Sequence, residues 1–154
     1  MEVYIFRHAR SDFRSEDEDP PISEQGRSET ERVVELANKR LGFKPTALVC
    51  SPLLRAKQTA DLTRKQLGLK PVVVNGCMYG DAEPGEVLKF LSKYRKEDKV
   101  ALVSHMPLVF ELLYSFVGGR GEVELFNGSI AAISFKGKAA EGKGKLRWLI
   151  QPGV

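Results

Sequence analysis

The chain has 154 residues, of which 42% are hydrophobic and 29% are charged, and its formal net charge is +4. This length and apolar content suffice for a single domain, residues 1–154, with a sizeable core. No apolar run approaches the roughly 18 residues of a membrane span, and the N-terminus lacks the pattern of a secretion signal, so we expect a cytoplasmic protein without a membrane partner. The positive charge is mild and no basic stretch is interleaved with aromatic residues, which argues against a nucleic-acid partner.

Apolar runs alternate along the chain with segments of helical periodicity, which is the pattern of an α/β fold. In chain order, we expect strands at Glu2–Phe6, Ala47–Cys50, Val72–Asn75 and Val100–Ser104, separated by helices at Ser23–Leu41, Leu53–Leu67, Pro84–Tyr94 and Pro107–Val117. The strands are almost entirely apolar, as expected for a parallel sheet that is covered on both faces. Two later strands, "SIAAISF" and "LRWLI", flank a stretch rich in glycine and lysine and indicate a hairpin. The expected fold is a three-layer sandwich with a mostly parallel central sheet and helices on both faces.

Both histidines of the chain follow apolar strands. His8 comes directly after Arg7 in "VYIFRHARSD", and His105 ends the run "VALVSH". A third strand, "ALVC", leads into a helix that carries Arg55 in its first turn. Because sites in open α/β sheets form at the carboxyl ends of the strands, we expect these four side chains to meet in one crevice.

These residue types suit the chemistry of a phosphoryl group. Arginine guanidinium groups offer planar donors that match phosphoryl oxygens, and the N-termini of the helices at residues 53 and 107 add backbone N–H groups. A histidine among these cations stays neutral, and a neutral imidazole can attack phosphorus. The arginines and the second histidine can stabilise the negative charge of the transition state by their placement. Two histidines without a cluster of carboxylates make a poor metal site, so we expect a reaction without metal or cofactor.

Three other segments each have two interpretations. The acidic segment "DFRSEDEDPP" after the first strand is either a solvated loop or a rim that influences which substrates approach. The segment "GKAAEGKG" has the glycine spacing of a phosphate-binding loop, but it lacks the Ser/Thr and the following helix, so we expect a hairpin turn. The apolar segment "LVFELLYSFV" is expected to be a core helix rather than an interface.

The motifs "FRHARSD", "CSPLLRAKQTA" and "VSHMP" resemble the three signatures of the histidine phosphatase superfamily, branch 1, also called the phosphoglycerate mutase-like family. In particular, the chain resembles the short SixA-type phosphohistidine phosphatases. "PPISEQGRSE" is similar to the start of their first helix and "MYGDAEPGEVLKFL" to the segment before their fourth strand, so the likeness covers nearly the whole chain. Ala9 stands where many relatives have glycine, although SixA-like relatives also carry alanine. The resemblance implies a phosphoglycerate mutase-like fold.

The resemblance also implies a metal-independent phosphatase in which His8 is the nucleophile and becomes transiently phosphorylated. The residues that would hold the transferred phosphoryl group are Arg7, Arg55 and His105, with Ser51 and the Met106 amide at the pocket wall or behind it. "FNGS", residues 126–129, lies in a region that approaches the site in relatives.

Larger relatives use an acid before the last histidine to protonate an alkoxide leaving group. Asp81 and Glu83 are the candidates here, and either could instead be a solvated loop carboxylate. A protonated imidazole leaves more readily than an alkoxide, so a short chain without lid insertions suits phosphohistidine on another protein. The alternatives are a phosphatase of small phosphate esters such as sugar phosphates, and a non-catalytic module that binds phosphorylated partners. The histidine–arginine set argues against the module, because binding alone requires no nucleophile.

Overall fold

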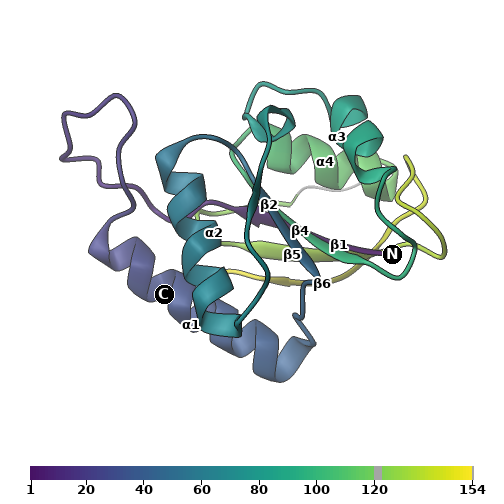
Figure 1. Ribbon diagram of the computed structural model, residues 1–154, viewed down its shortest axis with the longest axis horizontal. Helices are drawn as coiled ribbons and strands as arrows, with labels where there is room; N and C mark the ends of the chain where they lie inside the picture. The colour runs from purple at the N-terminus through teal and green to yellow at the C-terminus, as the bar shows by residue number, and fades with distance from the viewer. Residues whose placement is uncertain (120–122, 154) are drawn as a thin grey trace.

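The computed structural model describes residues 1–119 and 123–153. Its strands form one sheet in the order β3-β2-β4-β1-β5-β6 (Figure 1). Their bounds are Glu2–Arg7 for β1, Ala47–Cys50 for β2, Val73–Val74 for β3, Lys99–Ser104 for β4, Ile130–Ser134 for β5 and Lys145–Ile150 for β6. The pairs β1–β4, β4–β2 and β2–β3 are parallel, whereas β5 is antiparallel to both of its neighbours. The expected mostly parallel sheet is confirmed.

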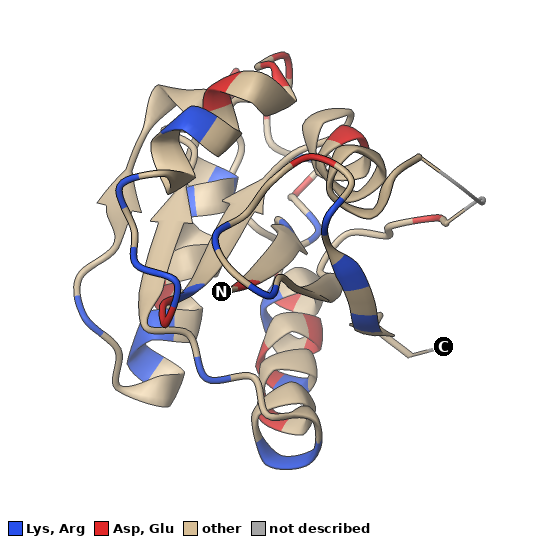
Figure 2. Cartoon of the chain, turned by 90° about the vertical axis from the view of Figure 1, so that its right-hand side faces the viewer, with Lys and Arg blue, Asp and Glu red and all other residues tan. Residues whose placement is uncertain are grey.

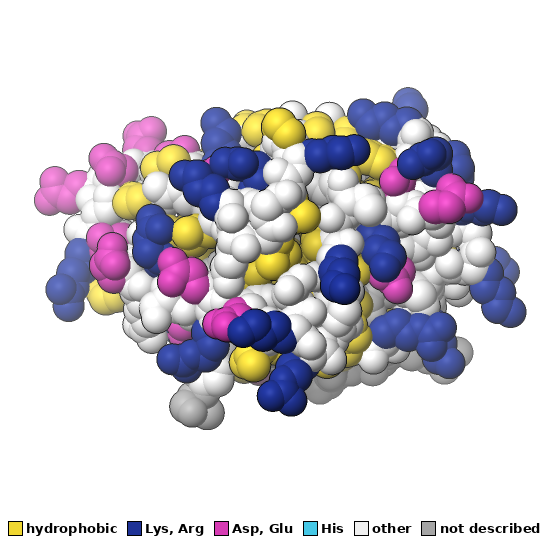
Figure 3. All heavy atoms as spheres, turned by 60° about the horizontal axis from the view of Figure 1, so that its bottom comes forward, with side chains coloured by type: hydrophobic (Ala, Val, Ile, Leu, Met, Phe, Trp, Pro, Cys, Tyr) yellow, Lys and Arg dark blue, Asp and Glu magenta, His cyan; other side chains and the backbone are white. Residues whose placement is uncertain are grey.

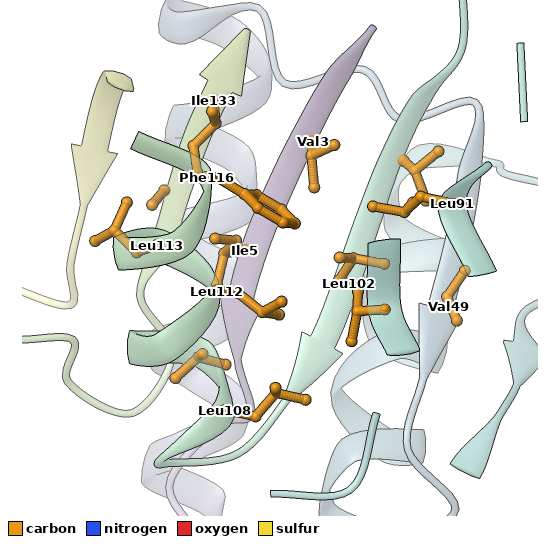
Figure 4. Close-up of a cluster of buried hydrophobic side chains, with 14 of the residues drawn as sticks. Val3, Ile5, Val49, Leu91, Leu102, Leu108, Leu112, Leu113, Phe116 and Ile133 are labelled. Carbon is orange, nitrogen blue, oxygen red and sulfur yellow. The ribbon is translucent and has the colours of Figure 1, made fainter. Parts of the chain in front are cut away.

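Helices cover both faces of the sheet, as the three-layer expectation requires (Figure 1). Helices α1 (Glu24–Leu41) and α2 (Leu54–Leu67) pack on one face, and α3 (Pro84–Leu91) and α4 (Leu108–Val117) pack on the other. A short 3-10 helix, η1 (Gly76–Met78), follows β3. Alternate residues of each strand point to opposite faces, so the sheet supplies two cores. Figure 4 shows the core under α3 and α4, where Val3 and Ile5 of β1 lie among leucines and Phe116 of α4.

Two expected elements are shorter than the sequence indicated. β3 contains only Val73 and Val74, and their side chains are 40% and 48% exposed. The expectation of four strands covered on both faces is therefore wrong for β3, because it lies at the edge of the sheet beside a single neighbour, β2. Helix α3 ends at Leu91 rather than Tyr94, and the chain continues in turns. The apolar segment of α4 is a core helix, as expected, with five buried side chains.

The start of α1 is fastened to the segment that follows β1. Ser23 caps the helix by accepting a hydrogen bond from the Gly26 N–H at 3.0 Å, and its own N–H donates to the Arg10 carbonyl at 2.9 Å. Gly26 lies so close to this segment that a Cβ there would be 2.3 Å from the Arg10 oxygen. Glycine at this position thus lets the helix pack directly against the backbone two residues beyond His8.

Three parallel strands end at the same edge of the sheet, and hydrogen bonds join the residues that follow them. The His8 N–H donates to the Ser104 carbonyl at 2.9 Å, and the Ser51 N–H donates to the Val103 carbonyl at 3.2 Å. The ends of β1 and β2 are therefore both tied to the end of β4. This edge is where the sequence places its two histidines.

The β5–β6 connection lies at the opposite end of the molecule, because Ser134 of β5 pairs with Glu2, the first residue of β1. The segment "GKAAEGKG" belongs to this connection between antiparallel strands, which confirms the expected hairpin turn. A hollow of about 650 Å³ lies here, lined by Lys136, Lys138, Lys143, Lys145 and Arg147 among others. Figure 2 looks onto this end, where Lys and Arg segments recur in the hairpin and the neighbouring loops. Neither histidine lines this hollow.

Candidate active site

His8 is buried, with 7% of its surface exposed, directly after β1. Its Nδ1 lies 2.7 Å from the Ala9 carbonyl oxygen. Because a carbonyl can only accept a hydrogen bond, Nδ1 carries the proton and the lone pair of the neutral ring is on Nε2. Burial lowers the pKa of His8 to about 3, and the charges of His105, Arg55 and Arg7 lower it too, against the opposing effect of the Ala9 bond. His8 is therefore a neutral imidazole with a defined tautomer at physiological pH.

Arg7, the last residue of β1, presents a partly buried guanidinium group. Its Nη1 donates to the Leu125 carbonyl at 2.6 Å. Its Nε is buried and has no partner in the described part of the chain. Burial also lowers the pKa of Arg7, although an arginine remains charged at any pH of interest. A buried N–H without an acceptor is costly, so this group is suited to receive an anionic oxygen.

His105 follows β4, and its ring centroid lies 4.9 Å from that of His8 with an interplanar angle of 50°. Its Nε2 is hydrogen-bonded to the hydroxyl of Ser51, while its Nδ1 is buried without a partner among the described residues. Burial lowers the pKa of His105 to about 4, and Arg55 and Arg7 lower it too, whereas Asp19 acts in the opposite direction. Ser51 is therefore connected to the site by its hydrogen bond with His105.

Arg55 lies in the first turn of α2, where its charge acts on both imidazoles. Thr59, one turn further along, donates its hydroxyl hydrogen to the Arg55 carbonyl at 2.8 Å and accepts the Ala9 N–H at 2.9 Å. This hydroxyl joins α2 to the segment after His8. Thr59 could not be predicted from the sequence, because a threonine at a buried position within a helix gives no local signal of function.

The backbone after His8 needs no glycine. No non-glycine residue in the described ranges has a positive φ, so the Cβ of Ala9 causes no strain. Residues 126–129 do approach the site, as the resemblance implied: the Gly128 N–H donates to the carbonyls of Arg7 and His8 at 3.1 and 3.0 Å. The Asn127 side-chain amide donates to the His8 carbonyl at 3.3 Å. This turn holds the end of β1 in place.

Met106 and the two expected acids lie at the border of the site. The Met106 side chain is 40% exposed and lines a hollow of about 370 Å³ with Arg7, Phe110, Val123, Glu124, Leu125 and Phe126. Asp81 and Glu83 are exposed, and neither carboxylate bonds to any described residue. Their segment nevertheless borders the site, because the Gly80 carbonyl accepts the Leu108 N–H at 3.2 Å. The structure thus brings the segment, but neither carboxylate, into contact with the histidine region.

The acidic loop between β1 and α1 reaches the site through Asp19. Both carboxylate oxygens accept the Leu54 N–H, at 3.0 and 3.1 Å, and Oδ1 lies 3.8 Å from Arg55 Nη1. The sequence left open whether this loop is solvated or forms a rim that influences which substrates approach, and no local pattern distinguished Asp19 from the neighbouring acidic residues.

Within the described residues, no group of three or more His, Cys, Asp or Glu side chains is arranged to hold a metal ion. No helix in the described ranges combines the length and apolar character needed to cross a membrane.

Two buried imidazoles and two arginines at the carboxyl edge of such a sheet are the arrangement that the three motifs implied. The sequence model of the histidine phosphatase superfamily (branch 1) matches residues 3–78. An uncharacterised protein of Picosynechococcus sp. (strain ATCC 27264 / PCC 7002 / PR-6) is 35% identical over 114 residues, which is 70% of this chain and 67% of that protein. The chain belongs to the histidine phosphatase superfamily, branch 1.

Solved structures share the whole fold. The protein histidine phosphatase SixA complexed with tungstate has a TM-score of 0.87 and 23% identity, covering 99% of this chain and 97% of its own. The putative phosphohistidine phosphatase SixA from Agrobacterium tumefaciens has a TM-score of 0.80 and 23% identity, covering 99% and 98%. A mycobacterial glucosyl-3-phosphoglycerate phosphatase complexed with VO3 has a TM-score of 0.72 and 19% identity, covering 96% and 98%. The expected phosphoglycerate mutase-like fold is confirmed.

Proposed function

We propose that this chain is a metal-independent phosphatase that forms a phosphorylated His8 intermediate and acts on phosphohistidine in another protein. The observation that carries the proposal is the state of His8. Its Nδ1–H is bound to the Ala9 carbonyl, its lowered pKa keeps the ring neutral, and its neighbours are Arg7, Arg55 and His105. A neutral imidazole with a directed lone pair beside fixed cations is a competent nucleophile for phosphorus.

The reaction follows from these groups in two displacements. The substrate's phosphoimidazole ring first takes a proton from solvent. His8 Nε2 then attacks the phosphorus atom, a new N–P bond forms, and the N–P bond of the substrate breaks as its imidazole leaves in the neutral form. Water then attacks phosphorylated His8, which releases inorganic phosphate and returns the neutral ring. Charge accumulates on the phosphoryl oxygens in both steps. The unpartnered Arg7 Nε and His105 Nδ1, together with the Arg55 guanidinium, are suited to stabilise it.

The surroundings of the site support phosphohistidine over an alkoxide ester. An alkoxide leaving group needs a proton from a placed acid, whereas a phosphoimidazole can be protonated on its ring before it leaves. Asp81 and Glu83 are exposed and bond to no described residue, so neither is held ready as such an acid. The hollow beside Arg7 is apolar around Met106 and Phe126, which are 40% and 53% exposed. A protein side chain with apolar neighbours suits this surface better than a polyhydroxylated sugar.

The remaining site residues receive their roles within the same proposal. Ser51 orients His105 through its hydroxyl, and Met106 contacts the leaving group. Asp81 or Glu83 would act only on an ester, after its side chain turns toward the site.

The proposal is tested by measuring phosphate release from a peptide that carries phosphohistidine, beside p-nitrophenyl phosphate and a panel of sugar phosphates. We expect the phosphohistidine peptide to be preferred, and His8→Ala to abolish turnover while the protein stays folded. Acid-labile phosphate should be trapped on His8 of the wild-type protein. A preference for a sugar phosphate would change the proposed substrate but leave His8 as the proposed nucleophile. Turnover by His8→Ala at the wild-type rate would overturn the covalent mechanism, and phosphate binding without turnover of any substrate would support a binding module.

Chelation tests the metal-independent part of the proposal. Because Arg7, Arg55 and His105 can supply the positive charge and donors for the phosphoryl oxygens, we expect EDTA to leave the rate unchanged after dialysis. Loss of activity that is restored by adding a divalent cation would contradict this part.

A further inference from the structure

Helix α2 begins without a cap of its own. The residue at its N-cap position, Leu53, provides no side-chain hydrogen bond, and the first turn contains no acidic residue. The first N–H groups of a helix have no partners within the helix and need external acceptors. Asp19 fills this role from the β1–α1 loop, 35 residues earlier in the chain, by accepting the Leu54 N–H with both carboxylate oxygens.

The same carboxylate contacts the guanidinium group of Arg55. The Oδ1–Nη1 distance is 3.8 Å, and the side chains of Arg55 and Asp19 are 23% and 46% exposed. In the described part of the chain, Arg55 forms no other ion pair, and its neighbours in the site are two imidazoles and a second arginine. A guanidinium on a long side chain has several rotamers to choose from. One carboxylate that holds both the helix start and the side chain removes that freedom.

We propose that Asp19 is a positioning residue, which holds the first turn of α2 and the Arg55 guanidinium in the arrangement that receives the phosphoryl group. The inference rests on the proposed function in that Arg55 binds phosphoryl oxygens. Asp19 itself does not touch the substrate. Asp19 acts through Arg55. Its negative charge at the rim of the site repels anions, so its favourable effect on activity comes from the position in which it holds Arg55.

Substitutions separate the cap from the charge. Asp19→Ala removes both, whereas Asp19→Asn keeps an oxygen that can accept the Leu54 N–H and removes the charge. Glu18→Gln is the matched control, because Glu18 is the adjacent loop residue, is exposed, and bonds to no described residue. It removes the same charge from the same loop without touching α2.

We expect Asp19→Ala to lower kcat at least tenfold and to weaken the binding of inorganic phosphate severalfold. Asp19→Asn should lie between Asp19→Ala and the wild type, and Glu18→Gln should stay within twofold of the wild type. Thermal unfolding of each variant checks that the loss of activity is not a loss of folded protein. If Asp19→Ala fails to fold, kcat and phosphate affinity are compared between Asp19→Asn and the wild type instead. A wild-type kcat and phosphate affinity in the folded Asp19 variants would overturn the proposal.

A double-mutant cycle with Arg55→Ala tests whether Asp19 acts through Arg55. In the Arg55→Ala background, adding Asp19→Ala should change kcat by less than twofold, because the group that Asp19 positions is already absent. The same tenfold loss in both backgrounds would show that Asp19 acts independently and would overturn the inference.

The binding measurement distinguishes failure of this inference from failure of the proposed function. A calorimetric titration with inorganic phosphate measures binding and requires no turnover. If the wild-type protein hydrolyses none of the substrates but binds phosphate, the proposed function fails while the Asp19 comparison still stands. If Asp19→Ala and the wild type bind phosphate equally and the wild type is active, only the Asp19 inference fails.

Discussion

At the scale of single residues, the side chains of the candidate site differ in which of their polar atoms have hydrogen-bond partners. Arg7 Nε and His105 Nδ1 are buried and have no partners among the described residues. Such groups cost stability in the absence of an acceptor. His8 differs because its Nδ1 is bonded to the Ala9 carbonyl, which leaves the opposite nitrogen available. The proposed phosphoryl-binding residues and the proposed nucleophile thus differ in which of their nitrogen atoms already have a hydrogen-bond partner in the protein.

Ser51→Ala tests the support of His105. The substitution removes the hydroxyl partner of Nε2, so both ring nitrogens of a buried imidazole would lack partners among the described residues. Leaving a buried polar group unsatisfied costs about 1–3 kcal/mol, and we expect kcat/KM to fall by about tenfold with the fold retained. Steady-state kinetics on the preferred substrate would measure this, with Ser28→Ala on the exposed face of α1 as the control. Equal kcat/KM values for the Ser51 and Ser28 variants would remove Ser51 from the site.

At the scale of elements, the starts of three helices lie beside the candidate site residues. α1 packs against the backbone after His8, α2 carries Arg55, and α4 begins at Leu108, three residues after His105. These contacts require close approach of backbone segments, which the sequence achieves with glycine. A Cβ on Gly80, for example, would lie 2.7 Å from the Met106 oxygen and 3.1 Å from the His105 Cβ.

Gly26→Ala tests the packing of α1 on the segment after His8. Within a helix, glycine to alanine normally stabilises by about 1 kcal/mol. Here the new methyl would lie 2.3 Å from the Arg10 oxygen, so we expect overpacking to destabilise the protein by about 1–3 kcal/mol and to lower activity by displacing His8.

Gly85→Ala provides the matched control in α3, because a Cβ there would meet nothing within 4 Å. Urea unfolding should show opposite signs for the two variants. If Gly26→Ala is as stable as Gly85→Ala, the contact between α1 and the Arg10 backbone is not tight.

At the scale of the whole molecule, charge is distributed unevenly. The acidic loop lies beside the site, whereas the lysines of the β5–β6 hairpin lie at the other end of β1. In Figure 3, acidic side chains gather toward the left end of the visible face and dark-blue basic side chains predominate toward the right. The net charge of +4 therefore gives no information about the proposed phosphoryl site, where the positively charged side chains are Arg7 and Arg55.

The buried histidines make the stability of the whole molecule depend on pH. Burial lowers the pKa of His8 to about 3 and that of His105 to about 4, from an ordinary value of 6.5. The unfolded chain therefore binds more protons below pH 6.5, so the stability contributed by neutral histidines is present above that pH and is lost as the pH falls toward the folded values. Between pH 7.5 and 5.5, we expect the free energy of unfolding to fall by about 1 kcal/mol from His8 alone.

Urea unfolding at the two pH values measures this effect, and His8→Asn provides the comparison because its side chain does not titrate. The decrease should be smaller in the variant than in the wild type. An equal decrease in both proteins would show that folding does not lower the pKa of His8.

The sequence by itself determined the layers of the fold and the residues at the ends of its strands. Almost entirely apolar runs separated by segments of helical periodicity predict a parallel sheet that is covered on both faces. Parallel strands end at one edge, so His8, His105 and Arg55 could be predicted to meet before any coordinates. The hairpin near the end of the chain could also be predicted, because two strand-like runs flank a stretch rich in glycine and lysine.

Only the tertiary structure decided which other residues join the site. Asp19 reaches the start of α2 across 35 residues, and Thr59 bonds the Ala9 N–H across 50. Such contacts depend on loop conformation and on the direction of side chains, which periodicity does not encode. For the same reason, the sequence predicted that Asp81 and Glu83 lie close to the site, but it did not predict the direction of their carboxylates. The exposure of β3 follows from its place at the edge, which is a property of strand order rather than of its apolar residues.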